Sequence, residues 1–318
     1  MTENAPHEQE HEVPDACFQC NSPDYEPGYQ VKLCKTCRKR FSRYPLKKNI
    51  LLGAIGLGIL FALSLYKFPS QYKAAITYEK GIAFADNREF MSAENAFIAV
   101  LRVHPAHEKS KVHLLTAYYY NNKTGEALQL LAQLDKNPAY KINPELEDEV
   151  ETVREMWLKD KGQEQLFNTA SGYFSDNRFH EADSLFKKII RDNPTNFRAS
   201  SLYCIGLRQE KKYKEALTEV NRVLSYNHQL PQALAEKAVI LLMLKKDKEA
   251  LALAEQTSQS NPFYNTGWFT LGVARYCNND IEGAMEAYHK MKGLTVDTYH
   301  PADSLLRIIT QHINFRNL

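Results

Sequence analysis

The pattern of hydrophobic and polar positions divides the chain into three parts. The run from Asn49 to Tyr66 has eighteen residues and no charge, and its few polar residues lie near its ends. Downstream of about residue 74, small and large apolar residues recur with a fixed period. Upstream, the chain is polar and holds four of its six cysteines. This pattern predicts an all-α protein with one membrane-spanning helix and a small N-terminal module.

The uncharged run is long enough to cross a membrane, because about 20 apolar residues at 1.5 Å of rise span the bilayer core. A buried core helix is the alternative, but such a helix normally keeps a polar stripe that this run lacks. A cleaved signal peptide fits poorly, since the run lies behind the cysteine-rich segment. We expect a transmembrane helix over residues 49–67 and a linker over residues 68–73.

The charges that flank the run predict its orientation. The fifteen residues before it carry seven Lys or Arg and no acidic residue, whereas the fifteen after it carry three Lys and one Glu. Cytoplasmic flanks of membrane helices are enriched in Lys and Arg. We therefore expect a single-pass protein, with the N-terminus in the cytoplasm and the larger C-terminal part outside it, in a bacterial inner membrane.

The C-terminal part repeats every 34 residues. One alanine position recurs in six copies: Ala93, Ala127, Ala182, Ala216, Ala250 and Ala284. A second small residue precedes it by twelve positions in most copies, as at Gly81, Ala170 and Gly272, and a proline such as Pro194 follows by twelve. Small residues let two helices approach closely, and the proline stops the second helix. The pattern resembles the tetratricopeptide repeat, an α-solenoid of helical hairpins.

The resemblance implies a solenoid over residues 74–318. Its repeats fall at residues 74–107, 108–141, 163–196, 197–230, 231–264 and 265–298. Residues 142–162 are additional to this period, begin with an acidic segment after a proline, and carry apolar residues on one face. We expect one inserted helix there, with two sub-arrays that meet at an angle. Residues 301–316 resemble the helix that closes such arrays.

The resemblance also implies which side chains line an inner groove. Repeat positions 2, 5, 9 and 12 give these candidate partner-binding residues: Phe167, Phe174, Ile205, Arg208, Val239, Leu242, Phe269, Val273 and Tyr276. The Lys, Asn and Arg set with which some of these repeats grip carboxylates is absent. An apolar groove suits an amphipathic helix or an extended hydrophobic peptide. The C-terminal helix or tight packing between repeats is the alternative, and either would cover part of the face.

Residues 15–40 carry two C-x₂-C pairs separated by thirteen residues. The four candidate metal ligands are Cys17, Cys20, Cys34 and Cys37. Two such pairs complete a tetrahedral sulfur shell for structural Zn²⁺ with no open position for a catalytic water. The module resembles a small zinc ribbon or treble clef, in which the metal supplies the folding energy. Two disulfides are the alternative, which a reducing cytoplasm disfavours.

Three further predictions concern this N-terminal side. Residues 1–14 are polar, acidic and proline-containing, so we expect a disordered tail. The alternation of Tyr29, Val31 and Leu33 predicts a short strand. The basic residues up to 48 suggest nucleic-acid binding, but beside a membrane helix residues 41–48 are better explained as a juxtamembrane segment facing anionic lipids.

Composition adds little chemistry. The chain has 318 residues and a formal net charge of +2, which favours neither nucleic acid nor an acidic partner. The sequence contains no phosphate-binding glycine loop, no G-x-S-x-G and no H-E-x-x-H. We expect a non-catalytic, membrane-anchored scaffold that binds a protein or peptide at the bacterial envelope. A cytoplasm-facing adaptor or signalling protein at the membrane, with the zinc module and the repeats on one side, is the alternative.

Overall fold

The computed structural model describes residues 15–42, 48–294 and 301–317. Over these residues the regular structure is helical throughout, with no strand. The chain forms two compact units, Met1–Pro69 and Ser70–Leu318. The all-α prediction is confirmed. The tail predicted over residues 1–14 and most of the predicted juxtamembrane segment lie outside the described residues.

The N-terminal module consists of turns followed by the short helix α1 (Lys35–Ser42). The strand predicted around Tyr29 and Val31 is wrong, because these residues lie in turns and bends. The segment is held by isolated backbone hydrogen bonds, such as that from Glu26 N–H to Leu33 O at 3.0 Å, and not by the regular hydrogen-bond ladder of paired strands. The Arg38 guanidinium lies 3.6 Å from the centre of the Tyr29 ring and forms an ion pair with Glu26 at 2.9 Å. The side chain of Arg38 is thus part of the module, not of a free cationic segment.

The apolar run lies in α2 (Lys48–Asp86), a helix of 39 residues with Pro69 inside it. Residues 68–73, predicted to be a linker, are helical. A proline removes a single backbone donor, and the residues that follow Pro69 include the good helix formers Gln71, Lys73 and Ala74. The helix therefore continues into the first repeat.

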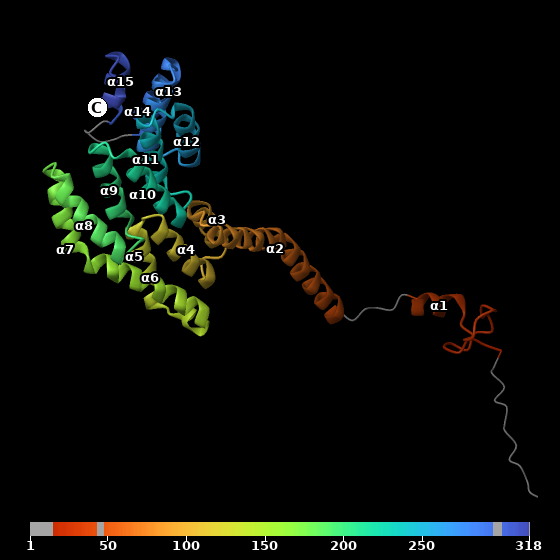
Figure 1. The fold of residues 1–318 in the computed structure, drawn as a ribbon. Helices are drawn as coiled ribbons and strands as arrows, with labels where there is room; N and C mark the ends of the chain where they lie inside the picture. The colour runs from red at the N-terminus through yellow and green to blue at the C-terminus, as the bar shows by residue number, and fades with distance from the viewer. Residues whose placement is uncertain (1–14, 43–47, 295–300, 318) are drawn as a thin grey trace, which may run out of the picture. The chain divides into compact units, whose positions relative to one another are not determined.

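The second unit is a succession of helical hairpins (Figure 1). The end of α2 precedes α3 (Phe90–Val103), and the following helices are α4 (Glu108–Tyr120), α5 (Thr124–Lys136), α7 (Glu164–Ser175), α8 (Phe179–Asp192), α9 (Phe197–Gln209), α10 (Tyr213–Tyr226), α11 (Pro231–Met243), α12 (Asp247–Ser260), α13 (Asn265–Cys277) and α14 (Ile281–Leu294). Consecutive helices pack in pairs, and each pair packs on the next. The array thereby buries three apolar clusters, each larger than a single hairpin could form.

A left-handed residue marks the same point of every hairpin, where the first helix ends. These residues have φ between 58° and 64°: Arg88, Asn122, Asn177, Lys211, Lys245 and Asn279. They follow one another at 34 residues, except that 55 separate Asn122 from Asn177. A left-handed residue after a helix reverses the chain sharply, and Asn tolerates this conformation better than Lys or Arg. The backbone thus repeats with the same period as the sequence, interrupted by 21 extra residues.

The extra residues form the 3₁₀ turn η1 (Ala139–Ile142) and the helix α6 (Pro144–Gly162). The Asn143 side chain caps α6 by accepting from the Glu145 N–H at 3.0 Å, and Pro144 occupies the first helical turn. The buried side chains Leu146, Val150 and Val153 pack α6 onto α4. A single packed helix was expected here from the apolar periodicity.

The first repeat also contacts the fourth, through a set of hydrogen bonds between residues 88–92 and 225–229 that we call the closure contact. His228 N–H donates to Arg88 O at 3.0 Å, and Ser92 N–H donates to Gln229 Oε1 at 3.0 Å. Beside them, the buried Asn227 Nδ2 donates to Asn121 Oδ1 at 2.9 Å. The array therefore turns back on itself, which a simple row of hairpins does not.

The C-terminal end of the array is covered by α15 (Pro301–Thr310) and by η2 (Phe315–Asn317). The fully buried Leu305 of α15 packs so closely on α13 that a Cβ at Gly272 would lie 2.4 Å from its Cδ2. Arg316 Nε donates to Leu242 O at 3.0 Å, and its guanidinium also pairs with Asp247. The capping helix was predicted over residues 301–316, but its α-helical part ends at Thr310, six residues earlier.

Candidate functional site

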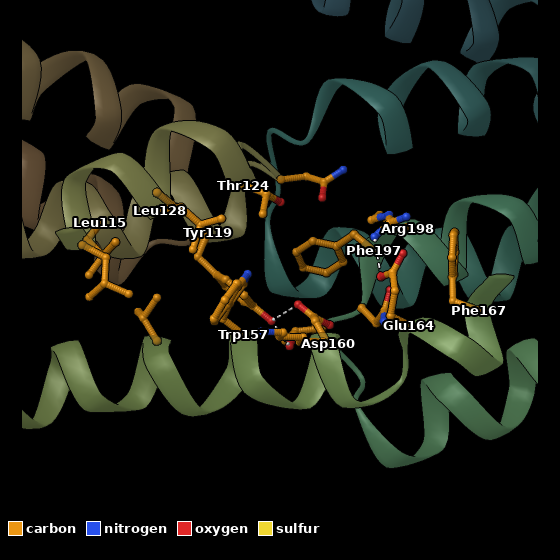
Figure 2. Close-up of a pocket in the computed structure, with 17 residues that line it drawn as sticks. Leu115, Tyr119, Thr124, Leu128, Trp157, Asp160, Glu164, Phe167, Phe197 and Arg198 are labelled. Carbon is orange, nitrogen blue, oxygen red and sulfur yellow. Dashed lines mark hydrogen bonds and ion pairs between the residues drawn. The ribbon is translucent and has the colours of Figure 1, made fainter.

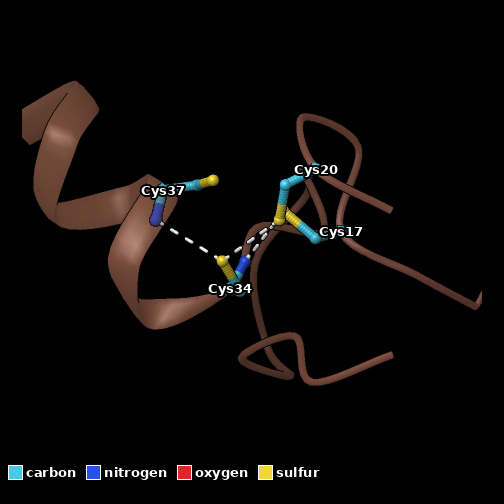
Figure 3. Close-up of side chains that lie close together, drawn as sticks. All are labelled: Cys17, Cys20, Cys34 and Cys37. Atoms are coloured by element: carbon cyan, nitrogen blue, oxygen red, sulfur yellow. Dashed lines mark hydrogen bonds between the residues drawn. The ribbon is translucent and has the colours of Figure 1, made fainter. Parts of the chain in front are cut away.

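The four cysteines of the N-terminal module converge on one point (Figure 3). Each offers one Sγ, and all four sulfur atoms lie within 4.8 Å of one another. The Sγ atoms of Cys20 and Cys34 are 3.6 Å apart, far beyond a disulfide bond of about 2.05 Å. Zn–S bonds of about 2.3 Å in a tetrahedron place sulfurs about 3.8 Å apart, so this spacing fits a four-sulfur metal site.

Two local structures position these thiols. After the first pair, Asn21 adopts φ 55° and its N–H donates to Cys17 O at 2.8 Å, which closes the knuckle. The turn needs a left-handed residue, and asparagine takes the place of the glycine that the motif usually carries. The second pair straddles the start of α1, where unpaired N–H groups favour negative charge. Cys37 N–H donates to Cys34 Sγ at 3.4 Å.

The environment of the cluster favours a thiolate before any metal binds. A hydrogen bond from the Cys34 backbone N–H, at 3.2 Å, lowers the pKa of the Cys17 thiol to about 6. The hydrogen bond of Cys37 with Cys34, and to a lesser degree its hydrogen bond with Cys20, raises the pKa of the Cys37 thiol to about 12. Neighbouring thiolates repel one another, so the four cannot ionise together without a cation between them. The four sulfur donors could therefore hold a soft divalent metal with all four positions filled by protein.

The apolar part of α2 presents its side chains outward. Among the described helices it is the one long and apolar enough to cross a membrane, and no residue of its apolar window is buried. Large side chains such as Leu57, Leu60 and Phe61 are more than half exposed. In water such a surface would be costly, at about 25 cal/mol per Å² of apolar area. Either a bilayer or another apolar surface is needed to cover it.

The predicted groove residues fall into two groups. Leu242 and Val273 are 0% exposed and Phe167 and Val239 are nearly buried, because the first helices α7, α9, α11 and α13 pack in sequence on one another. These four side chains belong to the core in this structure. The remaining five keep part of their surface exposed: Phe174, Ile205, Arg208, Phe269 and Tyr276.

The exposed group is not equally available. Arg208 Nε donates to Glu236 Oε1 at 2.8 Å, so its charge is already paired. Phe269 and Tyr276 pack against the core that includes α15, and their remaining surface faces outward. Phe174 lies edge-on to Phe179 with ring centres 5.3 Å apart. Apolar surface is thus present along the first helices, but in smaller patches than the sequence predicted.

A cavity between the second and third repeats was not predicted from the sequence. It lies where α4 and α5 face α6, α7 and the start of α9, and its volume is about 330 Å³ (Figure 2). We call it the junction cavity. Its aliphatic side is formed by Leu115, Leu128 and Leu131, and its aromatic side by Tyr119, Trp157 and Phe197. It arises because α6 replaces a hairpin and packs mainly on α4, which leaves space beside α5.

One of the ionisable groups in the wall of this cavity, Asp160, is largely withdrawn from solvent. The Asp160 carboxylate accepts from Tyr119 Oη at 3.1 Å and from Asn193 Nδ2 at 2.7 Å. Burial raises the pKa of Asp160 to about 6, and burial likewise raises the pKa of Tyr119. Near the mouth, Arg198 and Glu164 form an ion pair at 3.1 Å. Asp160 thus joins α4, α6 and the loop before α9.

The raised pKa of Asp160 predicts a pH-dependent stability. The folded protein holds this proton more tightly than the unfolded chain, so the group's contribution falls as pH rises from about 4 to about 6. Asp160→Asn removes the buried charge while Tyr119 and Asn193 keep polar partners. We expect the free energy of unfolding of the variant to be about 1 kcal/mol higher than that of the parent chain at pH 7.5, after allowance for the solvent that reaches the carboxylate. Near pH 4 we expect no difference between the two.

Thermal unfolding followed by circular dichroism between pH 4 and 8 measures this difference. Asp148→Asn, an exposed aspartate on the same helix, is the matched control and should show no such pH dependence. A constant offset between Asp160→Asn and the parent chain at every pH would contradict the prediction, because it would reflect packing and not titration.

Comparisons with known proteins agree with the repeats. The family profile described as tetratricopeptide repeat matches residues 78–141. No curated protein matches the chain. Among solved structures, a tetratricopeptide repeat protein from Parabacteroides merdae is 19% identical with a TM-score of 0.41, over 74% of this chain and 98% of that one. PilW, described as a type IV pilus biogenesis factor, is 15% identical with a TM-score of 0.38, over 73% and 98%.

A third structure, YrrB, is described as a tetratricopeptide repeat protein with an unusual peptide-binding site. It is 16% identical with a TM-score of 0.37, over 68% of this chain and the whole of that one. The hairpins, the 34-residue spacing of their left-handed residues and the profile match over residues 78–141 all point the same way. Residues 78–141 match the tetratricopeptide repeat, and the helical hairpins of the rest of the array recur with the same 34-residue spacing.

Proposed function

We propose that this protein is a membrane-anchored, non-catalytic scaffold whose repeats hold a protein or peptide partner at the bacterial envelope. The observation that carries the anchoring is the outward-facing apolar surface of α2, free of charge over eighteen residues. Seven cations before it and three after it support a cytoplasmic N-terminus and an extracytoplasmic array. The partially exposed Phe174, Ile205, Phe269 and Tyr276 support an apolar peptide as the partner.

The N-terminal module would hold one structural Zn²⁺ through Cys17, Cys20, Cys34 and Cys37. The convergence of four thiol sulfurs within 4.8 Å supports this assignment. A tetrahedral set of four cysteines leaves no position for a substrate or a reactive water. The metal's part would therefore be to order a segment too short to bury a core of its own.

A cytoplasm-facing adaptor is the second candidate, and two cysteines favour it. Cys204 and Cys277 are free thiols in the array, which is more usual in a reducing compartment. Cys204 is buried, and its burial raises the pKa of the thiol, so it would resist oxidation in either compartment. The orientation of the membrane helix decides between the two candidates.

Topology can be measured on the full chain. We expect it to stay in the membrane pellet after alkaline carbonate extraction, and we expect added protease to digest the repeats in intact spheroplasts. A tag at the N-terminus should become accessible only after lysis. Recovery in the soluble fraction would contradict membrane anchoring. Protection of the repeats in intact spheroplasts would instead establish the cytoplasm-facing adaptor.

A further inference from the structure

A second, smaller cavity shares two wall residues with the junction cavity. The smaller one has a volume of about 50 Å³, and Asn122 and Phe197 belong to the walls of both. Its other walls include the short side chains Ser201, Cys204 and Ala233. A large space and a small space thus lie on either side of one aromatic ring, between the second repeat and the fourth and fifth.

The junction cavity has room for one large ring. Its volume of about 330 Å³ is roughly twice that of an engineered apolar cavity that binds benzene. Aromatic walls favour offset or edge-to-face contact with another ring, and Tyr119, Trp157 and Phe197 supply such walls. The charged lining residues are two of each sign, and Glu164 already pairs with Arg198. An uncharged aromatic group fits this lining better than an ion.

Asp160 adds a directional preference. Its carboxylate accepts two hydrogen bonds, from Tyr119 and Asn193, and a carboxylate has lone-pair sites for about four. A ring that carries an N–H or O–H donor can fill a further site, whereas a phenyl or leucyl group cannot. Tryptophan and tyrosine are the side chains that combine a large ring with such a donor.

The position of Asn122 favours a peptide over a free small molecule. Its side chain is exposed at the left-handed turn that the two cavities share. A side-chain amide can donate to a backbone C=O and accept from a backbone N–H, as an extended peptide requires. A chain that crosses Asn122 can place one side chain in each cavity, whereas a single ring can fill only one.

We propose that the two cavities bind an extended segment of the partner protein. A tryptophan or tyrosine side chain enters the junction cavity with its N–H or O–H directed to Asp160, and a small residue enters the cavity beside Cys204. The Asn122 amide holds the backbone between them. This assignment rests on the proposed function as a peptide-holding scaffold, and it moves the main anchor from the predicted groove residues to the junction between the sub-arrays.

The chain carries its own reporter for this site. It has two tryptophans, of which Trp157 lines the junction cavity and Trp268 lies on α13 with its Nε1–H bonded to Pro262 O at 2.8 Å. The full chain, labelled with 5-fluorotryptophan and held in lipid nanodiscs, should give two ¹⁹F resonances, assigned with a Trp157→Phe variant. We expect the blocked peptide acetyl-Tyr-Gly-Ala-amide to shift the Trp157 resonance in a saturable manner and to leave Trp268 unchanged.

Matched peptides and variants test the assignment of each part. Replacing Tyr in the probe by Leu or Lys should weaken binding at least tenfold. Ala127→Leu fills the cavity and should weaken binding of the Tyr peptide at least tenfold. Ala132 is exposed on the same helix, so Ala132→Leu should leave this binding unchanged. If Ala127→Leu loses its helical circular dichroism, Leu128→Phe provides the filling variant, since Leu128 is partly exposed at the same wall.

The outcomes separate this inference from the proposed function. No shift at millimolar probe, equal shifts at both tryptophans, or equal binding of the Tyr and Leu probes would overturn the inference. A folded filling variant that binds the Tyr probe as well as the parent chain would overturn it too. The topology experiment judges the scaffold at the membrane independently, because the probe titration does not depend on which side of the bilayer the array occupies.

Discussion

Loss of the zinc proposed at the four-cysteine cluster is expected to unfold the N-terminal module and to leave the helical array intact. The module has few other sources of stability, since Cys17 and Cys34 are its buried apolar side chains. Its ion pairs, such as Lys32 with Asp15, are exposed and contribute little. A structural Zn²⁺ contributes about 10–16 kcal/mol in small peptides, which exceeds what such a segment can gain by packing.

Metal content and proteolysis measure this effect on the full chain. Protein purified under reducing conditions should contain one equivalent of zinc, and Cys17→Ser or chelation should lower it to near zero. Limited proteolysis should then cut within residues 15–42, while the array melts as before. Cys277→Ser, a free thiol outside the cluster, is the control and should keep the zinc. Zinc well below one equivalent in the parent chain would contradict the assignment.

Shortening Leu305 is expected to destabilise the C-terminal end of the array by about 2–5 kcal/mol, the usual cost of a buried Leu→Ala change. Leu305 is 0% exposed, and its methyl groups fill the space above Gly272. The helix α15 packs on α13 and α14 and so shields the apolar face of the repeat that they form. Without a tight cap, the last hairpin should fray first.

Thermal or urea unfolding measures the loss, with Leu158→Ala as the control because the Leu158 side chain is 53% exposed. Gly272→Ala tests the same contact from the other side, since its methyl group would meet Leu305 Cδ2. The double variant should be more stable than the sum of the single losses predicts, because Leu305→Ala makes room for the added methyl group. Strict additivity would show that the two residues do not share one contact.

Local patterns in the sequence predicted most of the fold. Each hairpin is specified within 34 residues by its own small and large positions, and each C-x₂-C pair lies within one turn. The cluster of four thiols followed from those pairs alone. The prediction of a linker at residues 68–73 was wrong because Pro69 was taken to end the helix, although the residues after it favour helix formation. The strand was wrong because three alternating residues without a pairing partner do not make a sheet.

The features that sequence reasoning missed depend on residues far apart in the chain. The junction cavity is lined by residues as far apart in the chain as Leu115 and Phe197. The apolar periodicity of α6 predicted which face of this helix is buried, but not the space between α6 and α5. The closure contact pairs Ser92 with Gln229, two polar residues that carry no motif. Burial of Val273 and Leu242 depends on how tightly neighbouring first helices pack, which repeat positions alone do not specify.

The closure contact changes how this array would respond to force. An open solenoid stretches like a spring, because each repeat touches only its neighbours and small rotations add up along the row. Here the segment that follows α2 is hydrogen-bonded directly to the turn after α10, at Arg88 and His228. A pull applied through α2 therefore reaches the fourth repeat without passing along the hairpins between them. That half of the array should behave as a stiff ring, whereas the repeats beyond α11 remain free to flex around whatever they hold.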